Sequence, residues 1–146
     1  MDRVAERVRV ARRALGTLLD LDLSLSDPPS LMRHAAIQRF EYSLEGVWKA
    51  AKGVLSAAEG IDVASPRSAV RECFRSGMLD EAQARRALDM VSDRNLTVHT
   101  YNEELAIELF GRLGDHARLM SVWLNALDAH LHQTTMTWSE TDDPGA

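Results

Sequence analysis

The chain has 146 residues and a formal net charge of −5, and 45% of its residues are apolar. This length and apolar content suit a single domain with a sizeable core. The acidic balance gives no support to general affinity for nucleic acid, so any contact with RNA requires a local concentration of positive charge. A single cysteine excludes a disulfide framework within one chain and a cysteine-paired zinc site. Because the sequence has neither a long apolar run nor an apolar leader, we expect a cytoplasmic protein without a membrane span.

Five segments show helical periodicity, and none has the alternation of a convincing strand. The first helix is predicted over residues 2–23, where apolar residues recur every three or four positions. Pro28 and Pro29 break this helix and begin a long second one, which extends to about residue 58. Its apolar positions alternate in steps of three and four, which predicts one narrow packed seam. The seam consists of Ile37, Phe40, Leu44, Val47, Ala51 and Val54.

The remaining predicted helices are one short and two long. Ser65 and Pro66 open the short helix as N-cap and first residue, and Gly77 ends it. A fourth helix is expected over 80–98 and a fifth over 101–129, followed by a polar tail over 131–146. The sequence therefore predicts an all-α antiparallel bundle of four long helices and one short helix, with one domain over residues 1–130.

The segment of residues 94–101, Arg-Asn-Leu-Thr-Val-His-Thr-Tyr, carries the most informative chemistry. Arg94 offers a permanent cation with a planar set of donors for phosphate, and His99 can transfer protons near neutral pH. Together they could hold a phosphodiester and break it without a metal, with Asn95 in a supporting role. On an unbroken helix the two would point roughly 140° apart, so they converge only at a helix end or in a dimer.

A helix end is predicted between these two residues. The β-branched residues around Val98 weaken helix propensity. Thr100 and Glu103 then fit a capping box, which predicts that the next helix starts at Tyr101. A purely structural interpretation is also open, because an Arg and a His near a helix end are often a charge pair favoured by the helix dipole.

Three arginines, Arg67, Arg71 and Arg75, are spaced four residues apart on the short helix and form a cationic stripe. The stripe could contact RNA or an acidic partner, or it could simply be a solvated face. Cys73 is expected in the core. The histidines and carboxylates lack metal-ligand spacing and there is no glycine-rich phosphate loop, so we expect no metal and no cofactor.

Three blocks of residues, in the same order and over about residues 31–127, resemble HEPN-domain proteins. The nearest branch is the nucleotidyltransferase substrate-binding proteins, which pair with a minimal nucleotidyltransferase. The blocks are Arg39-Phe40-Glu41 with Glu45 and Trp48-Lys49; Ser65-Pro66-Arg67 with Arg71-Glu72, Phe74 and Gly77; and Asp93-Arg94-Asn95 with His99-Thr100-Tyr101-Asn102-Glu103. Arg94, His99 and Tyr101 match the HEPN toxin signature Arg-x4-His-x-Tyr. The first predicted helix is longer and richer in arginine than this resemblance leads us to expect.

The resemblance implies a toxin of a toxin–antitoxin pair, a homodimer whose two signatures face each other and cleave RNA without metal through attack by the 2′-hydroxyl. Arg94 and His99 would be catalytic. A partner nucleotidyltransferase, the antitoxin, would adenylylate Tyr101 rather than Tyr42, which is expected close to the packed seam of its helix. The alternative is a non-catalytic subunit that binds or docks the substrate of a minimal nucleotidyltransferase, and the acidic net charge slightly favours this alternative.

Overall fold

The structure, a computed structural model, describes residues 2–141, and all the regular elements in this range are helices. The elements are α1 (Asp2–Leu19), α2 (Ser30–Val54), the π-helical turn η1 (Leu55–Glu59), α3 (Pro66–Arg75), α4 (Glu81–Leu96), the 3-10 turn η2 (Thr97–His99) and α5 (Glu103–Thr141). The predicted all-α bundle of four long helices and one short helix is confirmed. Within the described range, no helix has the length and apolar character that crossing a bilayer requires.

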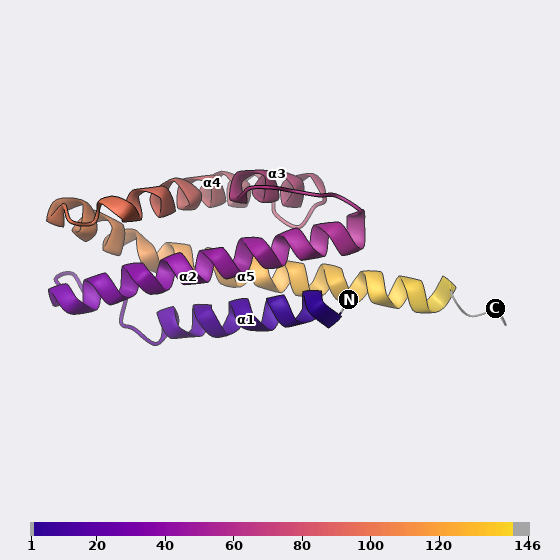
Figure 1. Cartoon of the computed structure of the whole chain (residues 1–146), viewed down its shortest axis with the longest axis horizontal. Helices are drawn as coiled ribbons and strands as arrows, with labels where there is room; N and C mark the ends of the chain where they lie inside the picture. Colours follow the sequence, from indigo (N-terminus) through magenta and orange to yellow (C-terminus); the bar gives the residue numbers. More distant parts are fainter. Residues whose placement is uncertain (1, 142–146) are drawn as a thin grey trace.

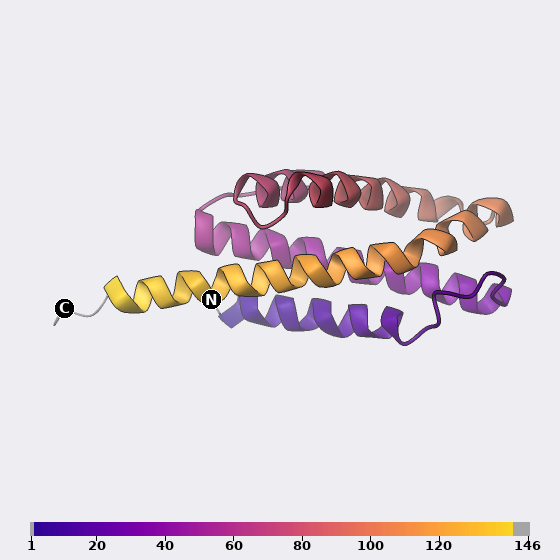
Figure 2. The same cartoon turned by 180° about the vertical axis from the view of Figure 1, so that it is seen from behind.

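The helices form three layers, with α1 on one side, α2 and α5 in the middle, and α3 with α4 on the other side (Figure 1). Each long helix runs antiparallel to the next one in the chain. The end of α4 and the start of α5 therefore lie at the same end of the bundle as the start of α2. The last turns of α5 extend beyond the other helices, at the end where α1 begins (Figure 2).

The core follows the predicted periodicity. All six seam residues of α2 are buried, and Phe40, Leu44 and Val47 are fully inaccessible to solvent. Trp123 on α5 is the largest fully buried side chain, and its indole nitrogen donates to the Sγ of Cys73 at 3.4 Å. Cys73 is fully buried, which confirms its predicted place in the core, and burial raises the pKa of its thiol to about 11.

Small residues let α1 and α2 pack closely. A Cβ placed on Gly46 would lie 3.2 Å from the Cα of Ala11, and a Cβ on Gly53 would lie 3.4 Å from a methyl group of Val4. A larger side chain at Gly46 would therefore push against backbone, which cannot swing aside as a flexible side chain can. Glycine inside a helix is normally unfavourable, and here the close helix contact explains it.

Two helix ends match the sequence analysis and one does not. Ser65 caps α3 and Gly77 has a positive φ of 79° at its end, as predicted. The predicted capping box of Thr100 and Glu103 is wrong, because the side chain of Asn102 accepts the amide of Leu105 at 3.3 Å and α5 starts two residues later than predicted. The hydroxyl of Thr100 instead donates back to a carbonyl of the preceding turn.

The fifth helix also ends later than predicted. α5 continues to Thr141 and so includes much of the segment that the sequence analysis assigned to a polar tail; residues 142–146 of that segment lie outside the described residues. Leu131 is buried, and His130 pairs with Glu59 of η1 at 2.7 Å. These contacts hold the helix on the bundle past Ala129, where the polar composition alone suggested that it would stop.

Candidate functional site

The segment of residues 94–101 forms the junction between α4 and α5. α4 ends at Leu96 and η2 follows at once, so the predicted helix end between Arg94 and His99 is confirmed. The junction lies at one end of the bundle (Figure 1). An ion pair with a buried arginine anchors it, since Glu103 at the start of α5 accepts a bond of 3.2 Å from Arg33 on α2.

Arg94 points toward α2 and is paired there. Its guanidinium donates to Glu45 at 3.2 Å, and Glu45 also accepts bonds from the indole of Trp48 at 3.0 Å and from Lys49 at 3.1 Å. Burial alone would raise the pKa of Glu45, but these donors together outweigh it and hold the pKa below its ordinary value. Glu45 is therefore a firmly ionised carboxylate that neutralises part of the charge of Arg94.

His99 and Tyr101 are both exposed and lie against each other edge to face. Their ring centroids are 6.0 Å apart at an interplanar angle of 80°, and Tyr101 is 85% exposed. Val98 beside them is 72% exposed. Over residues 2–141, no hydrogen bond or ion pair joins Arg94 to His99, so one chain alone does not bring the two signature residues together.

Other predicted site residues are dispersed. Asn95 is exposed on the last turn of α4. Arg67 donates to Ser92 of α4 at 2.8 Å, and Arg75 pairs with Glu72 of its own helix at 2.9 Å. Arg71 is exposed between them. The predicted stripe is therefore present on the surface, but two of its three cations already have partners.

Tyr42 lies within two residues of the packed seam, as predicted, but this position does not bury it. Its side chain is 61% exposed, and its hydroxyl accepts a bond from Gln38 at 3.0 Å. Tyr42 lies two residues before Leu44 of the seam, and a turn of 100° per residue places it on the outer face of α2. Both tyrosines of the chain are therefore accessible to a modifying enzyme.

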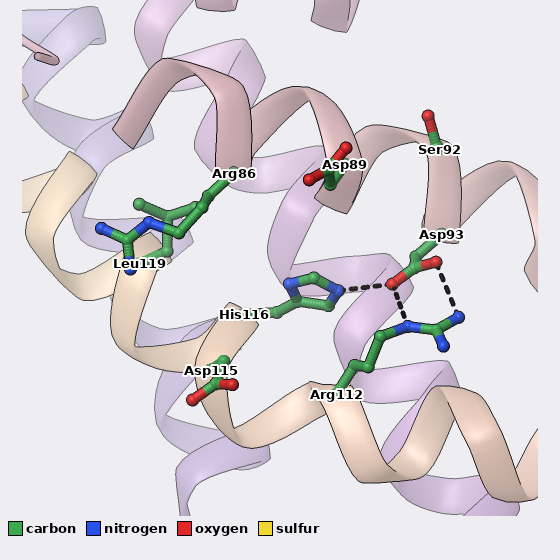
Figure 3. A pocket seen from close by; sticks show the side chains of 8 residues that line it. All are labelled: Arg86, Asp89, Ser92, Asp93, Arg112, Asp115, His116 and Leu119. Atoms are coloured by element: carbon green, nitrogen blue, oxygen red, sulfur yellow. Dashed lines mark hydrogen bonds and ion pairs between the residues drawn. The ribbon is translucent and has the colours of Figure 1, made fainter. Parts of the chain in front are cut away.

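A buried cluster between α4 and α5, which the sequence analysis missed, holds the junction in place. Asp93, immediately before Arg94, accepts two bonds from Arg112 at 2.8 and 2.9 Å and contacts the Nε2 of His116 at 2.7 Å (Figure 3). The ring of His116 stacks on Phe40 with 5.4 Å between centroids. This cluster fixes the rotation of α4, so that Asp93 faces α5 while Arg94 faces α2.

Opposing effects determine the ionisation of the cluster. Burial would raise the pKa of Asp93, but the hydrogen bonds from Arg112 and His116 lower it below the ordinary value, and the carboxylate in turn raises the pKa of Arg112. The spacing of Arg112 and His116, four residues apart on one helix face, is the signal in the sequence that could have suggested a shared partner. Across the described residues, no group of three or more histidines, cysteines and carboxylates is arranged to hold a metal ion.

The chain matches a known family over most of its length. The chain belongs to the family described as nucleotidyltransferase substrate binding protein like, whose model matches residues 6–129. It is 50% identical to a protein of known crystal structure from Thermus thermophilus, with a TM-score of 0.77 over 80% of this chain and 98% of that one.

A second solved structure shares the fold. It is a Haemophilus influenzae protein described as revealing the fold of a substrate binding domain of a nucleotidyltransferase, with 24% identity and a TM-score of 0.69 over 83% of this chain and 98% of that one. A search of the curated proteins gave no match.

Proposed function

We propose that this chain is a non-catalytic partner of a nucleotidyltransferase and that the enzyme docks on the α4–α5 junction. The observation that carries the proposal is the exposure of both Tyr101 and Val98 at that junction, at 85% and 72%. Large apolar and aromatic side chains left in water favour contact with another protein. The description of the family supplies the class of partner.

The pairing of Arg94 supports docking over catalysis. A phosphate approaching Arg94 must compete with the carboxylate of Glu45, which lies 3.2 Å from the guanidinium. The nearby imidazole of His99 contacts Tyr101 rather than Arg94. In one chain the cation and the imidazole therefore have separate partners and do not form a joint phosphate site.

Tyr101 is the acceptor that we propose for the docked enzyme. The phenol oxygen would attack the α-phosphorus of ATP, pyrophosphate would leave, and a base of the enzyme would take the phenol proton. The product carries an AMP group with one negative charge on a side chain that the fold leaves open. The ring of His99, with its centroid 6.0 Å from that of the phenol, would be a neighbour of the modified side chain.

The docking surface can be tested with matched variants. The chain would be mixed with nucleotidyltransferases from the same genome, the product of the neighbouring gene first, and complexes would be measured by size-exclusion chromatography. Val98→Asp should weaken the complex at least roughly tenfold by placing a charge in the contact. Val122→Asp, a similar change at an exposed position further along α5, should leave it intact. Equal effects of the two variants, or no complex with the wild type, would overturn the docking proposal.

The acceptor assignment has its own control. In the presence of the partner, ATP and Mg²⁺, mass spectrometry should find AMP-sized additions on the wild type and on Tyr42→Phe, but not on Tyr101→Phe. Because Tyr42 is 61% exposed, its accessibility makes it a fair competitor. Modification at Tyr42, or binding without any modification, would show that Tyr101 is not the acceptor.

The second candidate function is the metal-independent ribonuclease toxin. The observation that favours it is that Arg94, His99 and Tyr101 occur together at one exposed junction in the order of the HEPN toxin signature. A homodimer would have to supply His99 of one chain to Arg94 of the other and release Arg94 from Glu45. His99 would then transfer protons while Arg94 stabilised the charge on the phosphate, and the 2′-hydroxyl of the RNA would be the nucleophile.

An RNA assay separates the two candidates. The wild type would be incubated with RNA in EDTA beside His99→Ala and Arg94→Ala, and its mass in solution would be measured by sedimentation. Under the docking proposal the wild type leaves the RNA intact. Cleavage to 2′,3′-cyclic phosphate ends by a dimer, lost in both variants while their melting temperatures stay unchanged, would make the ribonuclease the function of the chain.

A further inference from the structure

A groove between α1 and α2, away from the exposed end of the α4–α5 junction, gathers positive charge in a chain that is acidic overall. The groove has a volume of about 360 Å³ and is lined by Arg7 and Val10 of α1 and by Trp48, Lys49 and Lys52 of α2. The chain contains only two lysines, and both are in this groove. The two helices lie side by side along their length (Figure 1).

The positive charge of the groove is only partly neutralised. Glu6 also lines it, but its carboxylate is bound to Arg9 at 2.7 Å and lies 3.7 Å from Arg13. Arg7 and Lys52 form no ion pair within the described part of the chain, so their charges are available to an anion. The guanidinium of Arg7 lies over α2, since a Cβ on the neighbouring Gly53 would be 3.5 Å from its Nη1.

The wall of the groove also offers a fixed aromatic ring. Trp48 is half-buried, and its indole nitrogen donates to Glu45 at 3.0 Å. The same carboxylate binds Lys49 at 3.1 Å, so the ring and the ammonium group are held together. Gly46 contributes no side chain to the wall, at a point where a Cβ would lie 3.2 Å from the Cα of Ala11. Val10, 49% exposed, adds an apolar surface opposite.

We propose that this groove binds a nucleotide, with the base on Trp48 and the phosphate on Arg7 and Lys52. An indole stacks on any base without needing a particular sequence, and lysine and arginine bind phosphate through charge and hydrogen bonds. A groove of this size and lining therefore suits a ligand with both a phosphate and a base. A free nucleoside triphosphate has both groups, and so does a nucleotide within a single-stranded nucleic acid. The groove includes residues of the arginine-rich first helix, which neither docking of a nucleotidyltransferase nor RNA cleavage at the junction requires.

One shared carboxylate links the groove to the end of α4. Glu45 contacts both Lys49 in the groove and Arg94 at the end of α4. A bound phosphate that draws Lys49 away from Glu45 would leave the carboxylate to Arg94 and the indole of Trp48. The nucleotide site stands whether or not Tyr101 is modified and whether or not the junction docks an enzyme.

Binding can be measured with two probes, ATP by calorimetry and a fluorescent single-stranded oligoribonucleotide by anisotropy, both at low salt. Lys52→Glu should weaken binding roughly tenfold or more because it reverses a charge at the phosphate. Trp48→Phe should weaken it severalfold through poorer stacking. Arg85→Glu reverses a charge of the same sign on α4, away from the groove, and should change binding less than about twofold. Circular dichroism melting would establish that each variant is folded.

The outcomes distinguish the source of the nucleotide. Binding of ATP alone assigns the groove to a free nucleotide, and binding of the oligonucleotide alone assigns it to a nucleic acid strand; each supports the proposal when Lys52→Glu weakens it. Competition between the two probes shows that they share one site. Failure of both probes to bind, or equal weakening by Lys52→Glu and Arg85→Glu, overturns the proposal.

Discussion

The substitution Asp93→Asn tests whether the cluster between α4 and α5 stabilises the bundle. Asp93 is 8% exposed and makes three short polar contacts, two with Arg112 and one with His116. The amide is nearly the same size, so the cavity term that accompanies a truncation is absent. The amide has no charge, and its NH₂ group would face the donors of Arg112 or His116. The substitution therefore isolates the charge and the hydrogen bonds.

The expected loss follows from the burial of each partner. A hydrogen bond to a charged buried group contributes about 1.5–3 kcal/mol, which applies to His116 because its ring is also buried. The side chain of Arg112 is 44% exposed and can return to water, so its share is reduced to about 1 kcal/mol or less. We expect a total loss of about 2–4 kcal/mol at pH 7, which corresponds to roughly 5–15 °C in melting temperature for a chain of this size.

The stabilisation by the Asp93 carboxylate should depend on pH in a defined direction. The hydrogen bonds hold the pKa of folded Asp93 below its ordinary value despite burial. A carboxyl with a lowered folded pKa stabilises the protein at every pH above the unfolded value of about 3.9, and this stabilisation is lost as the pH falls through the folded pKa. The difference between wild type and Asp93→Asn should therefore be constant from pH 7 to 5 and should narrow below about pH 4.

Urea unfolding monitored by circular dichroism at a series of pH values measures this difference. Asp115→Asn is the matched control, since Asp115 pairs with Arg118 but is 79% exposed, and it should change stability by less than about 1 kcal/mol. A loss at Asp93 below about 0.5 kcal/mol at pH 7 would refute the reasoning. A difference of the same size at the lowest pH where the protein stays folded would refute it as well.

Further predictions concern packing, capping and reactivity. Gly111→Ala, where a Cβ meets nothing within 4 Å, should stabilise the protein by up to about 1 kcal/mol, whereas Gly46→Ala should destabilise it because the new Cβ would meet the backbone of α1; thermal melts check both. Asn102→Ala should lower the free energy of unfolding by about 1 kcal/mol because it removes the cap of α5, and Thr100→Ala should lower it less. If urea unfolding shows the larger loss for Thr100→Ala, Thr100 is the cap, as the sequence predicted. Cys73 should resist a thiol reagent in the native protein and react once urea unfolds it, because the pKa of its buried thiol is about 11; rapid native reaction would contradict its burial.

The sequence by itself determined the local structure of this protein. Apolar residues at three- and four-residue spacing define α2 and its buried seam, because a helix brings such residues to one face whatever the neighbouring elements are. Ser65 and Gly77 determine the ends of α3, because a cap and a positive φ depend on residues close in the chain. The helix end between Arg94 and His99 was predictable for the same reason.

The tertiary structure decided which side chains meet. Arg94 pairs with Glu45, which is 49 residues away in the chain. Asp93 contacts Arg112 and His116 on another helix. Neither pairing follows from helical spacing within one segment. The exposure of Tyr42 follows from its position two residues away from the seam, but the pairing of Arg94 with Glu45 depends on how α4 is rotated against α2. Periodicity identifies the helices, but only their packing fixes the rotation of each one, and that rotation determines which charges are paired.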